Sequence, residues 1–184
     1  DDLPQVLVDA IVATEDSRYF QHNGVDIARF TKAVIGQLMG NSNAGGGSTL
    51  TMQVVKNTYT STEASGIQGI IRKFTDIYMS VFKVEKRYTK EEIIEFYVNI
   101  PYLGSGSYGV EQASQKYFGK STSELSLPEA AIIAGLFQAP DAYDPYSRPK
   151  LAEERKNIVL SLMKRHGYIS DKEYQLAKSI NIEE

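Results

Sequence analysis

The chain has 184 residues, of which 42% are hydrophobic and 23% charged, with a formal net charge of -3 and no cysteine. This length suits one domain, or one domain of two lobes, that buries a core without disulfides or metals. The acidic balance argues against a broad nucleic-acid-binding face, and the lack of cysteine excludes a disulfide scaffold and a thiol nucleophile. With only two histidines, His22 and His166, a histidine-based metal site is not expected.

Helical periodicity runs through nearly the whole chain. In chain order, helices are expected over residues 3–14, 27–38, 48–59, 70–82, 89–99, 127–137, 150–166 and 171–179. Irregular segments rich in glycine or polar residues are expected at 40–48, 60–66 and 101–109. No sustained strand alternation and no internal repeat is visible, so the predicted class is mostly α.

Three Ser/Thr-x-x-Glu patterns predict capping boxes at helix starts. They are Thr89 with Glu92, Ser126 with Glu129, and Ser170 with Glu173. No apolar run approaches the ~20 residues of a membrane span, and no signal peptide opens the chain. The abrupt start at "DDLPQVL" and end at "NIEE" are compatible with a fragment that lacks an anchor or a partner domain, which the sequence leaves open.

Two adjacent carboxylates close the first predicted helix. On a helical wheel at ~100° per residue, Glu15 falls at the edge of the apolar stripe, and Asp16 falls on the opposite side. A carboxylate at an apolar edge is partly desolvated, which suits it to exchange a proton near neutral pH. The alternative is that Glu15 is a helix-end residue with a backbone partner. Either way, we expect the two acids to have different surroundings.

The helix predicted over 70–82 has a strong apolar stripe, with Arg72, Asp76 and Lys83 on its opposite face. Arg72 and Asp76 are four residues apart, a spacing at which an exposed ion pair is worth about 0.3–0.5 kcal/mol. Two interpretations remain open. The polar face is either solvated and carries this weak pair, or it is the wall of a cleft.

The segment "GGGSTLTMQVVKN" (45–57) leads glycines into a Ser-Thr helix start, with Gln53 and Lys56 in the first turns. Backbone N–H groups at a helix start, the helix dipole, hydroxyls and a lysine together favour an anion such as a phosphate. No Lys-Ser/Thr pair follows the glycines, so the segment is not a P-loop. The alternative is that Ser48 is only an N-cap after a flexible loop.

These segments, in this order, resemble the peptidoglycan glycosyltransferase domain of bifunctional penicillin-binding proteins and monofunctional cell-wall transglycosylases. The first family motif, Glu-Asp-x-x-Phe-x-x-His-x-Gly, matches at Glu15, Asp16, His22 and Gly24. Later motifs match as "GGSTLTMQ" (46–53) followed by Lys56, "RKFTD" (72–76), "KEEIIEFYVN" (90–99), "YGVEQASQKYFGK" and "LSLPEAAIIAGLFQAPDAYDP". The resemblance covers nearly the whole chain.

The chain departs from the family pattern at a few positions. Tyr19 stands where the family usually has Phe, and Met52 replaces the first Gln of a pair. Gln68 stands where many members have a basic residue, in a loop (60–69) that is longer than usual. Asp76 replaces the second Glu, which retracts a catalytic carboxylate by one methylene. A shift of about 1 Å in such a group can lower the rate ~100-fold.

The resemblance implies a lysozyme-like helical domain with two lobes and a cleft between them, formed by residues 1–184 as a single domain. It implies that residues 26–45 form a mobile, membrane-facing lobe. The alternative for this region is that Phe30, Val34 and Leu38 pack in the core. The implied location is the extracytoplasmic face of the bacterial membrane, with the anchor absent from this chain and a transpeptidase domain possible in the full protein.

The resemblance also implies a reaction, the inverting polymerisation of lipid II with release of polyprenyl pyrophosphate. Glu15 would be the general base on the attacking hydroxyl, and Asp16 would hold the shape of the site. Asp76 would act at the pyrophosphate end, directly or through a divalent cation, Mg²⁺ or Mn²⁺. The substrate-binding residues implied by the motifs are Asp16, His22, Ser48, Thr49, Gln53, Lys56, Arg72 and Lys73. For His22, a structural hydrogen bond within its turn is an equal alternative.

Two other functions compete with this interpretation. A lysozyme or lytic transglycosylase also needs a protonatable Glu, but it has no use for phosphate-binding cations such as Lys56, Arg72 and Lys73. A non-catalytic module that binds lipid II or the membrane gains nothing from a base at Glu15. The partners that the resemblance implies are lipid II, the growing glycan chain and a membrane surface. Phosphoglycolipid inhibitors of the moenomycin kind are expected to bind at the donor side.

Overall fold

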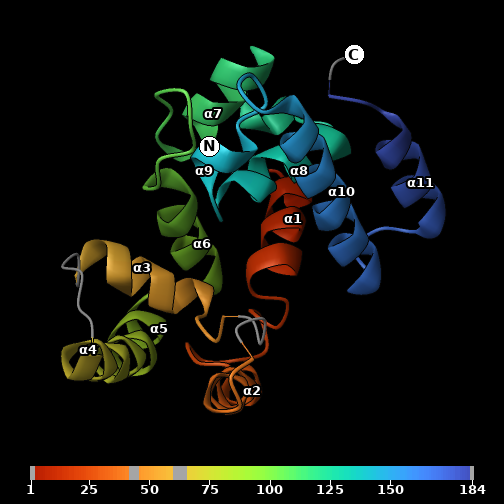
Figure 1. The fold of residues 1–184 in the computed structure, drawn as a ribbon. Coiled ribbons are helices and arrows are strands. Elements are labelled where there is room, and N and C mark those ends of the chain that lie inside the picture. The colour runs from red at the N-terminus through yellow and green to blue at the C-terminus, as the bar shows by residue number, and fades with distance from the viewer. Residues whose placement is uncertain (1–2, 42–45, 60–65, 183–184) are drawn as a thin grey trace. The chain divides into compact units, whose positions relative to one another are not determined.

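The computed structural model describes residues 3–41, 46–59 and 66–182. The chain divides into two compact units. The first contains Asp1–Ser17 and Val98–Glu184, and the second contains Arg18–Tyr97. Each unit is described by itself (Figure 1).

The first unit is built around helix α8 (Leu127–Leu136), which is buried on every side. Its sequence, LPEAAIIAGL, is apolar almost all round, as expected of a helix with no solvent face. Helices α1 (Gln5–Glu15) and α10 (Pro149–Arg165) pack against it, as Figure 1 shows. The remaining elements are α7 (Gly109–Phe118), the 3₁₀ turn η2 (Thr122–Glu124), α9 (Pro140–Tyr143) and α11 (Asp171–Ser179).

Close packing and one buried cation hold these helices together. A side chain at Gly135 on α8 would come within 2.7 Å of Arg155 on α10, so glycine permits this contact. The buried Lys156 on α10 pairs with Glu153 at 2.8 Å and donates to the carbonyl of Ile180 after α11. The C-terminal helix is thereby tied to the core of the first unit.

The second unit contains α2 (Ile27–Leu38), α3 (Leu50–Thr58), α4 (Gly66–Met79) and α5 (Glu85–Arg87). A π-helix, η1 (Ser80–Val84), connects α4 to α5 without a break. Most of α6 (Lys90–Asn99) also belongs to this unit, whose last residue is Tyr97. Helix α3 packs against both α4 and η1. Segments of the chain that carry separate predicted motifs therefore meet within the second unit.

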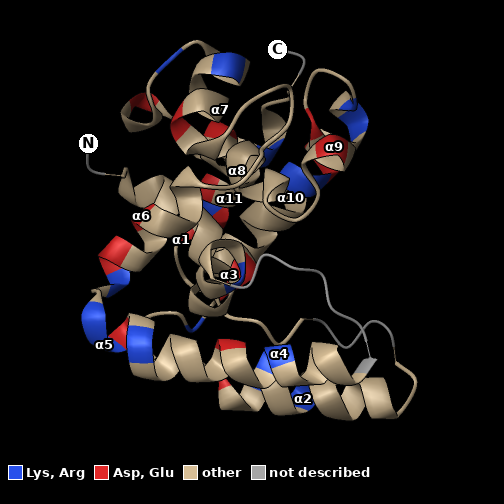
Figure 2. Ribbon diagram, turned by 90° about the vertical axis from the view of Figure 1, so that its left-hand side faces the viewer, with Lys and Arg blue, Asp and Glu red and all other residues tan. Residues whose placement is uncertain are grey.

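The apolar faces of α2 and α4 are exposed. On α2, Leu38 is 83% exposed and Val34 40%, so the alternative that they pack in the core is wrong for both residues. On α4 and η1 the exposed apolar side chains are Ile67, Ile70, Ile71, Phe74, Tyr78 and Phe82. Both helices are seen nearly end-on in Figure 1 and lengthwise in Figure 2, where most of their ribbon is uncharged. The described residues thus leave a row of apolar side chains on these helices uncovered.

The predicted class, mostly α and lysozyme-like, is confirmed, and no strand occurs among the described residues. The predicted helices are all present, and each capping box is formed, for example by Ser170 Oγ accepting from Glu173 N–H at 3.2 Å. Helix α7 was not predicted, although its sequence had been matched to a motif. The predicted loop at 60–69 is wrong for residues 66–69, because Gln68 and its neighbours lie in α4, and residues 60–65 lie outside the described residues.

Candidate active site

Glu15 is the last residue of α1, and it follows the buried Ile11, Val12 and Ala13. One carboxylate oxygen of Glu15, Oε1, is buried, while the residue as a whole is partly exposed. Asp16 is completely buried. The placement of Asp16 on the polar side of the helix was therefore wrong, because the helix ends at Glu15 and Asp16 has an extended φ of -156°. The two acids differ in burial, as predicted, but Asp16 is the more buried of the two, whereas the prediction placed Glu15 nearer the apolar side.

The turn after α1 belongs to the second unit and is held by Asp26. Arg18 binds the Asp26 carboxylate through two nitrogens at 2.8 and 2.5 Å, and the backbone N–H of Arg29 donates to it at 2.9 Å at the start of α2. Burial of Asp26 raises its pKa, but these hydrogen bonds outweigh burial, so the pKa lies below its usual value. His22 accepts the backbone N–H of Gly24 through Nδ1 at 3.1 Å. The structural alternative for His22 is thus present, and contact with substrate stays a prediction.

Gly24 brings this turn against η1. Its φ is +106°, a conformation that side-chain-bearing residues rarely adopt, and a Cβ atom would lie 2.9 Å from the carbonyl carbon of Ser80. The Gly24 carbonyl accepts the hydroxyl proton of Thr49 at 2.7 Å. Thr49 Oγ1 also accepts the Met52 N–H at 3.2 Å, so Thr49, not Ser48, caps α3. In this conformation Thr49 has no hydroxyl proton to offer a substrate.

A cluster of cations carried by α3 and α4 lies in the second unit. The Lys73 ammonium on α4 donates to Ser48 Oγ, at the end of the glycine-rich segment. Burial lowers the pKa of Lys73, the Asp76 carboxylate opposes this shift, and the charges of Lys56 and Arg72 add to it. The interpretation of Ser48 as a cap only is wrong. The structure instead brings Ser48, Lys56, Arg72, Lys73 and Asp76 into one electrostatic neighbourhood.

Helix α4 turns its polar side inward. Asp76 is only 4% exposed and Lys73 is half-buried, whereas Phe74 is 64% exposed. Asp76 is followed by Ser80, whose hydroxyl donates to the Asp76 carbonyl at 2.7 Å at the start of the π-helix. A solvated polar face is therefore wrong for Asp76, although the apolar stripe of a helix normally faces the protein core. The polar side of α4 forms a wall inside the second unit.

The described residues do not form a dedicated metal site. No group of three or more His, Asp or Glu residues in the described ranges is arranged to hold an ion. Asp76 is one carboxylate beside three cationic side chains, which does not resemble the oxygen-rich cage that Mg²⁺ or Ca²⁺ takes from a protein. The predicted Gln53 is half-buried, and its Oε1 lies 3.4 Å from the hydroxyl of Tyr97 on α6. This leaves the amide nitrogen of Gln53 as a potential donor.

Sequence reasoning missed a polar network around Glu85. Its Oε1 accepts from Thr51 Oγ1 on α3 at 2.5 Å and from the Lys90 ammonium on α6 at 2.7 Å. The Lys90 ammonium also lies 4.4 Å from the ring centroid of Tyr19, whose hydroxyl donates to the Lys90 carbonyl at 2.7 Å. The only available signal was the charge-rich stretch "VEKRYTKEE", which resembles an ordinary solvated surface. The network joins the turn of the first motif to the helices that carry the later ones.

The acidic end of α1 lies in the first unit, and the cation cluster of α3 and α4 lies in the second. The family model described as Transglycosylase matches residues 1–164. The chain belongs to this family and is a transglycosylase domain, which confirms the predicted enzyme class.

The proteins that this chain resembles in sequence are named penicillin-binding proteins. The chain is 44% identical to penicillin-binding protein 1A of Streptococcus oralis over 180 residues, which cover 98% of this chain and 28% of that protein. It is 40% identical to penicillin-binding protein 1A/1B of Bacillus subtilis, covering all of this chain and 20% of that protein. The crystal structure of penicillin-binding protein 1A from Haemophilus influenzae matches 97% of this chain and 16% of its own, with a TM-score of 0.56 and 32% identity. The chain thus spans between 16% and 28% of the length of these three relatives.

Proposed function

We propose that this domain polymerises lipid II into peptidoglycan glycan strands. The observation that supports this most directly is the cation cluster of the second unit, where Lys73 binds Ser48 beside the charges of Lys56 and Arg72. A hydrolase of glycans has no anionic leaving group and no need for such a cluster. A glycosyltransferase that releases a pyrophosphate needs fixed positive charge where negative charge develops.

In the proposed reaction, the 4-hydroxyl of one GlcNAc attacks C1 of the terminal MurNAc of the growing chain. Glu15 accepts the proton of that hydroxyl as the new glycosidic bond forms with inversion. The bond from C1 to the pyrophosphate oxygen breaks, and the lipid pyrophosphate leaves with the bonding electrons. Lys56, Arg72 and Lys73 neutralise this leaving group, with Ser48 and Gln53 as hydrogen-bond donors.

Asp76 holds the cation cluster together electrostatically. Its carboxylate favours the charged form of Lys73, against burial and the neighbouring cations. A divalent cation, Mg²⁺ or Mn²⁺, would have to take most of its ligands from pyrophosphate oxygens and water, so no step is assigned to it. Asp16, completely buried beside the base, is proposed to fix the end of α1.

The lipid of the substrate implies a membrane surface, and the exposed apolar faces of α2 and α4 suit one. None of the described helices is long and apolar enough to cross a bilayer. We therefore propose that the second unit lies against the extracytoplasmic leaflet, and that an anchor and a transpeptidase domain belong to the full protein. The part of the predicted membrane-facing segment at 42–45 lies outside the described residues.

The test is polymerisation of purified lipid II in detergent or vesicles, with the product separated by size. Wild type should form glycan strands, and Glu15→Gln should lower the rate at least about 100-fold, because general-base catalysis usually contributes that much. Glu154→Gln, at an exposed position of α10 outside the matched motifs, is the matched control and should keep the wild-type rate. A Glu15→Gln variant that retains more than about a tenth of the activity would show that Glu15 is not the base.

A further inference from the structure

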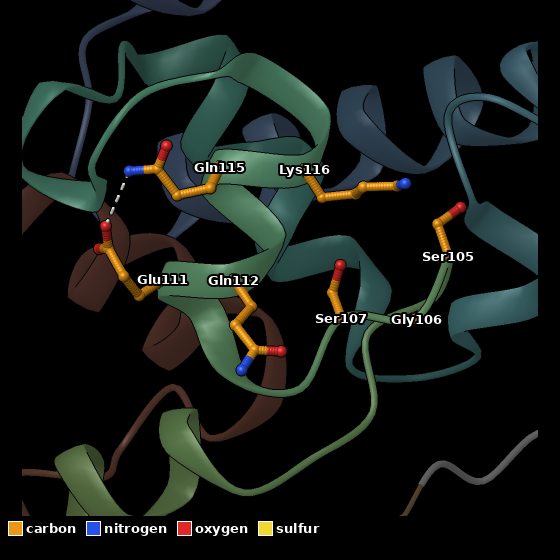
Figure 3. Close-up of a pocket in the computed structure, with 7 residues that line it drawn as sticks. All are labelled: Ser105, Gly106, Ser107, Glu111, Gln112, Gln115 and Lys116. Atoms are coloured by element: carbon orange, nitrogen blue, oxygen red, sulfur yellow. Dashed lines mark hydrogen bonds between the residues drawn. The ribbon is translucent and has the colours of Figure 1, made fainter.

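A hollow in the first unit is lined by none of the residues assigned to the proposed reaction. It has a volume of about 470 Å³, within the range of sites for small ligands. Loop 101–108 forms one wall and helix α7 the other, as Figure 3 shows. Its lining residues are Ser105, Gly106, Ser107, Glu111, Gln112, Gln115 and Lys116.

The loop wall is rigidly held. Ser105 donates to the buried Asp144 at 2.6 Å, and the Tyr117 hydroxyl donates to the Leu103 carbonyl at 2.9 Å. Gly104 has a φ of +88°, and a side chain there would come within 2.6 Å of the Tyr117 oxygen. Ser105 is the one described residue other than glycine with a positive φ, 48°. A wall fixed in this way loses little conformational entropy when a ligand binds.

Helix α7 presents complementary polar groups to the hollow. Gln112 Oε1 accepts the Tyr108 N–H at 2.9 Å, which fixes this side chain and leaves its NH₂ group as a donor. Gln115 Nε2 donates to Glu111 at 3.2 Å, which leaves the Gln115 carbonyl as an acceptor. Among the described residues the Lys116 ammonium has no acidic partner, and Figure 3 shows it extended toward the loop that carries Ser105. The wall therefore offers an amide donor, an amide acceptor and a cation.

The charge of Glu111 limits which ligands fit. Hydrogen bonds from the backbone and side chain of Thr122, with those from Gln115 and Ser121, hold the pKa of Glu111 below its usual value, although burial opposes them. An ionised carboxylate beside a single lysine disfavours a ligand rich in phosphate. It tolerates a ligand that is mostly neutral and carries an isolated carboxylate.

Two exposed tyrosines continue the loop wall. Tyr102 and Tyr108 face each other across an isolated β-bridge, with ring centroids 5.3 Å apart. They are 38% and 59% exposed, so their rings are available to solvent. Exposed aromatic rings with a polar tip suit surfaces that are apolar on one face and hydroxylated at the edge, as sugar rings are.

We infer that this hollow binds a lipid-free segment of N-acetylated glycan strand bearing peptide-stem carboxylates. In Figure 3 the amide groups of Gln112 and Gln115 point to opposite sides of α7, so the Gln112 donor matches the carbonyl of one acetamido substituent, the Gln115 acceptor matches the N–H of another, and Lys116 matches a carboxylate. The naming of the strand as peptidoglycan rests on the proposed function. Such a site would retain the polymer after the pyrophosphate has been released.

The experiment measures binding directly, without catalysis. The probes are a soluble, lipid-free peptidoglycan tetrasaccharide with its peptide stems and the neutral chitotetraose, titrated into the purified protein and followed by NMR. The double variant Gln112→Ala/Lys116→Ala should bind the peptidoglycan probe at least about fivefold more weakly than wild type. The matched control Lys172→Ala/Gln175→Ala, at exposed positions of α11, should stay within about twofold. Thermal unfolding of each variant excludes loss of fold.

Two further comparisons separate the possible outcomes. Lys116→Ala alone should weaken binding of the peptidoglycan probe but leave binding of chitotetraose unchanged. An equal effect on the binding of both probes would overturn the carboxylate assignment. Unchanged affinity in the double variant, or no binding by wild type, would overturn the site. Lipid II polymerisation is measured on the same preparations. If the protein polymerises lipid II but does not bind the probe, only this inference is contradicted. If the protein binds the probe at the hollow but does not polymerise lipid II, the proposed function is contradicted and a glycan-binding site remains.

Discussion

The ammonium of Lys90 lies 2.7 Å from Oε1 of Glu85, and the Glu85 side chain is only 8% exposed. Thr51 donates to the same oxygen of Glu85, and Tyr19 lies beneath the Lys90 ammonium. The ion pair and these two contacts together join α3, α5, α6 and the turn after α1 within the second unit. Breaking a buried pair leaves the other charge desolvated and uncompensated.

Glu85→Ala should therefore destabilise the protein by about 2–3 kcal/mol, somewhat less than a fully buried pair because Lys90 is partly exposed. The measurement is urea unfolding followed by circular dichroism. Glu95→Ala, an exposed glutamate of α6, should change the stability by less than about 0.5 kcal/mol. Equal stability of the two variants would mean that the Glu85 network contributes nothing to the fold.

Asp76 is buried at the inward face of α4, where a longer side chain has little room. Asp76→Glu should be neutral or harmful, since an added methylene in a packed site usually costs about 1–3 kcal/mol. Asp76→Asn keeps the shape but removes the charge that favours protonated Lys73, so it should lower lipid II polymerisation at least about tenfold. Steady-state rates of both variants check this prediction.

The control for the Asp76 variants is their thermal stability, and two results would contradict the prediction. Thermal unfolding of Asp76→Asn separates a lost charge from a lost fold. A gain of about tenfold in Asp76→Glu, or ~1.4 kcal/mol of transition-state stabilisation, would show that the shorter carboxylate is a defect. An active Asp76→Asn variant would remove this residue from the mechanism.

Lys73 should titrate below its ordinary value of 10.5, because burial and the nearby Lys56 and Arg72 disfavour its charge. Between the folded and unfolded pKa values the unfolded chain binds more protons, so the contribution of Lys73 to stability rises with pH there. Inorganic pyrophosphate should raise the pKa of Lys73, since an anion beside the ammonium favours the charged form.

The pKa is measured by NMR of ¹³C-methylated lysines, with Lys73→Arg to assign the signal. Lys172, at an exposed position of α11, is the internal control and should not respond to pyrophosphate. If pyrophosphate changes the pKa of neither lysine, or changes both pKa values equally, the cluster around Lys73 is not an anion site.

The exposed rings of Phe74 and Phe82 should contribute to membrane binding. Phe74→Ser/Phe82→Ser should weaken sedimentation with phospholipid vesicles at least about fivefold while leaving the unfolding temperature nearly unchanged, because neither ring is in the core. Leu176→Ser, at an equally exposed apolar position of α11, is the control. Similar losses in both proteins would indicate nonspecific adhesion and contradict a membrane-facing second unit.

Helix positions could be predicted well because the apolar repeat and the capping boxes are local signals. The orientation of α4 could not, since a helical wheel shows which residues share a face but not which face meets the protein. The same wheel failed for Asp16, which lies just past the end of α1. The pairing of Glu85 with Lys90 depends on a turn between two helices, which has no local pattern. No local pattern predicts that Ser48 contacts Lys73. The family resemblance assigned both residues to the substrate-binding set, and the packing of α4 against α3 brings them together.

Gly24 has no side chain, yet its position determines how closely the turn after α1 approaches the backbone at Ser80. Ser80 is one helical turn past Asp76 and begins the π-helix. Any residue larger than glycine would push apart two segments that carry separate motifs. In a mutational survey, position 24 would therefore score as intolerant alongside true catalytic groups. Its sensitivity would report spacing between segments, and only structural data on each variant would distinguish it from a residue that touches substrate.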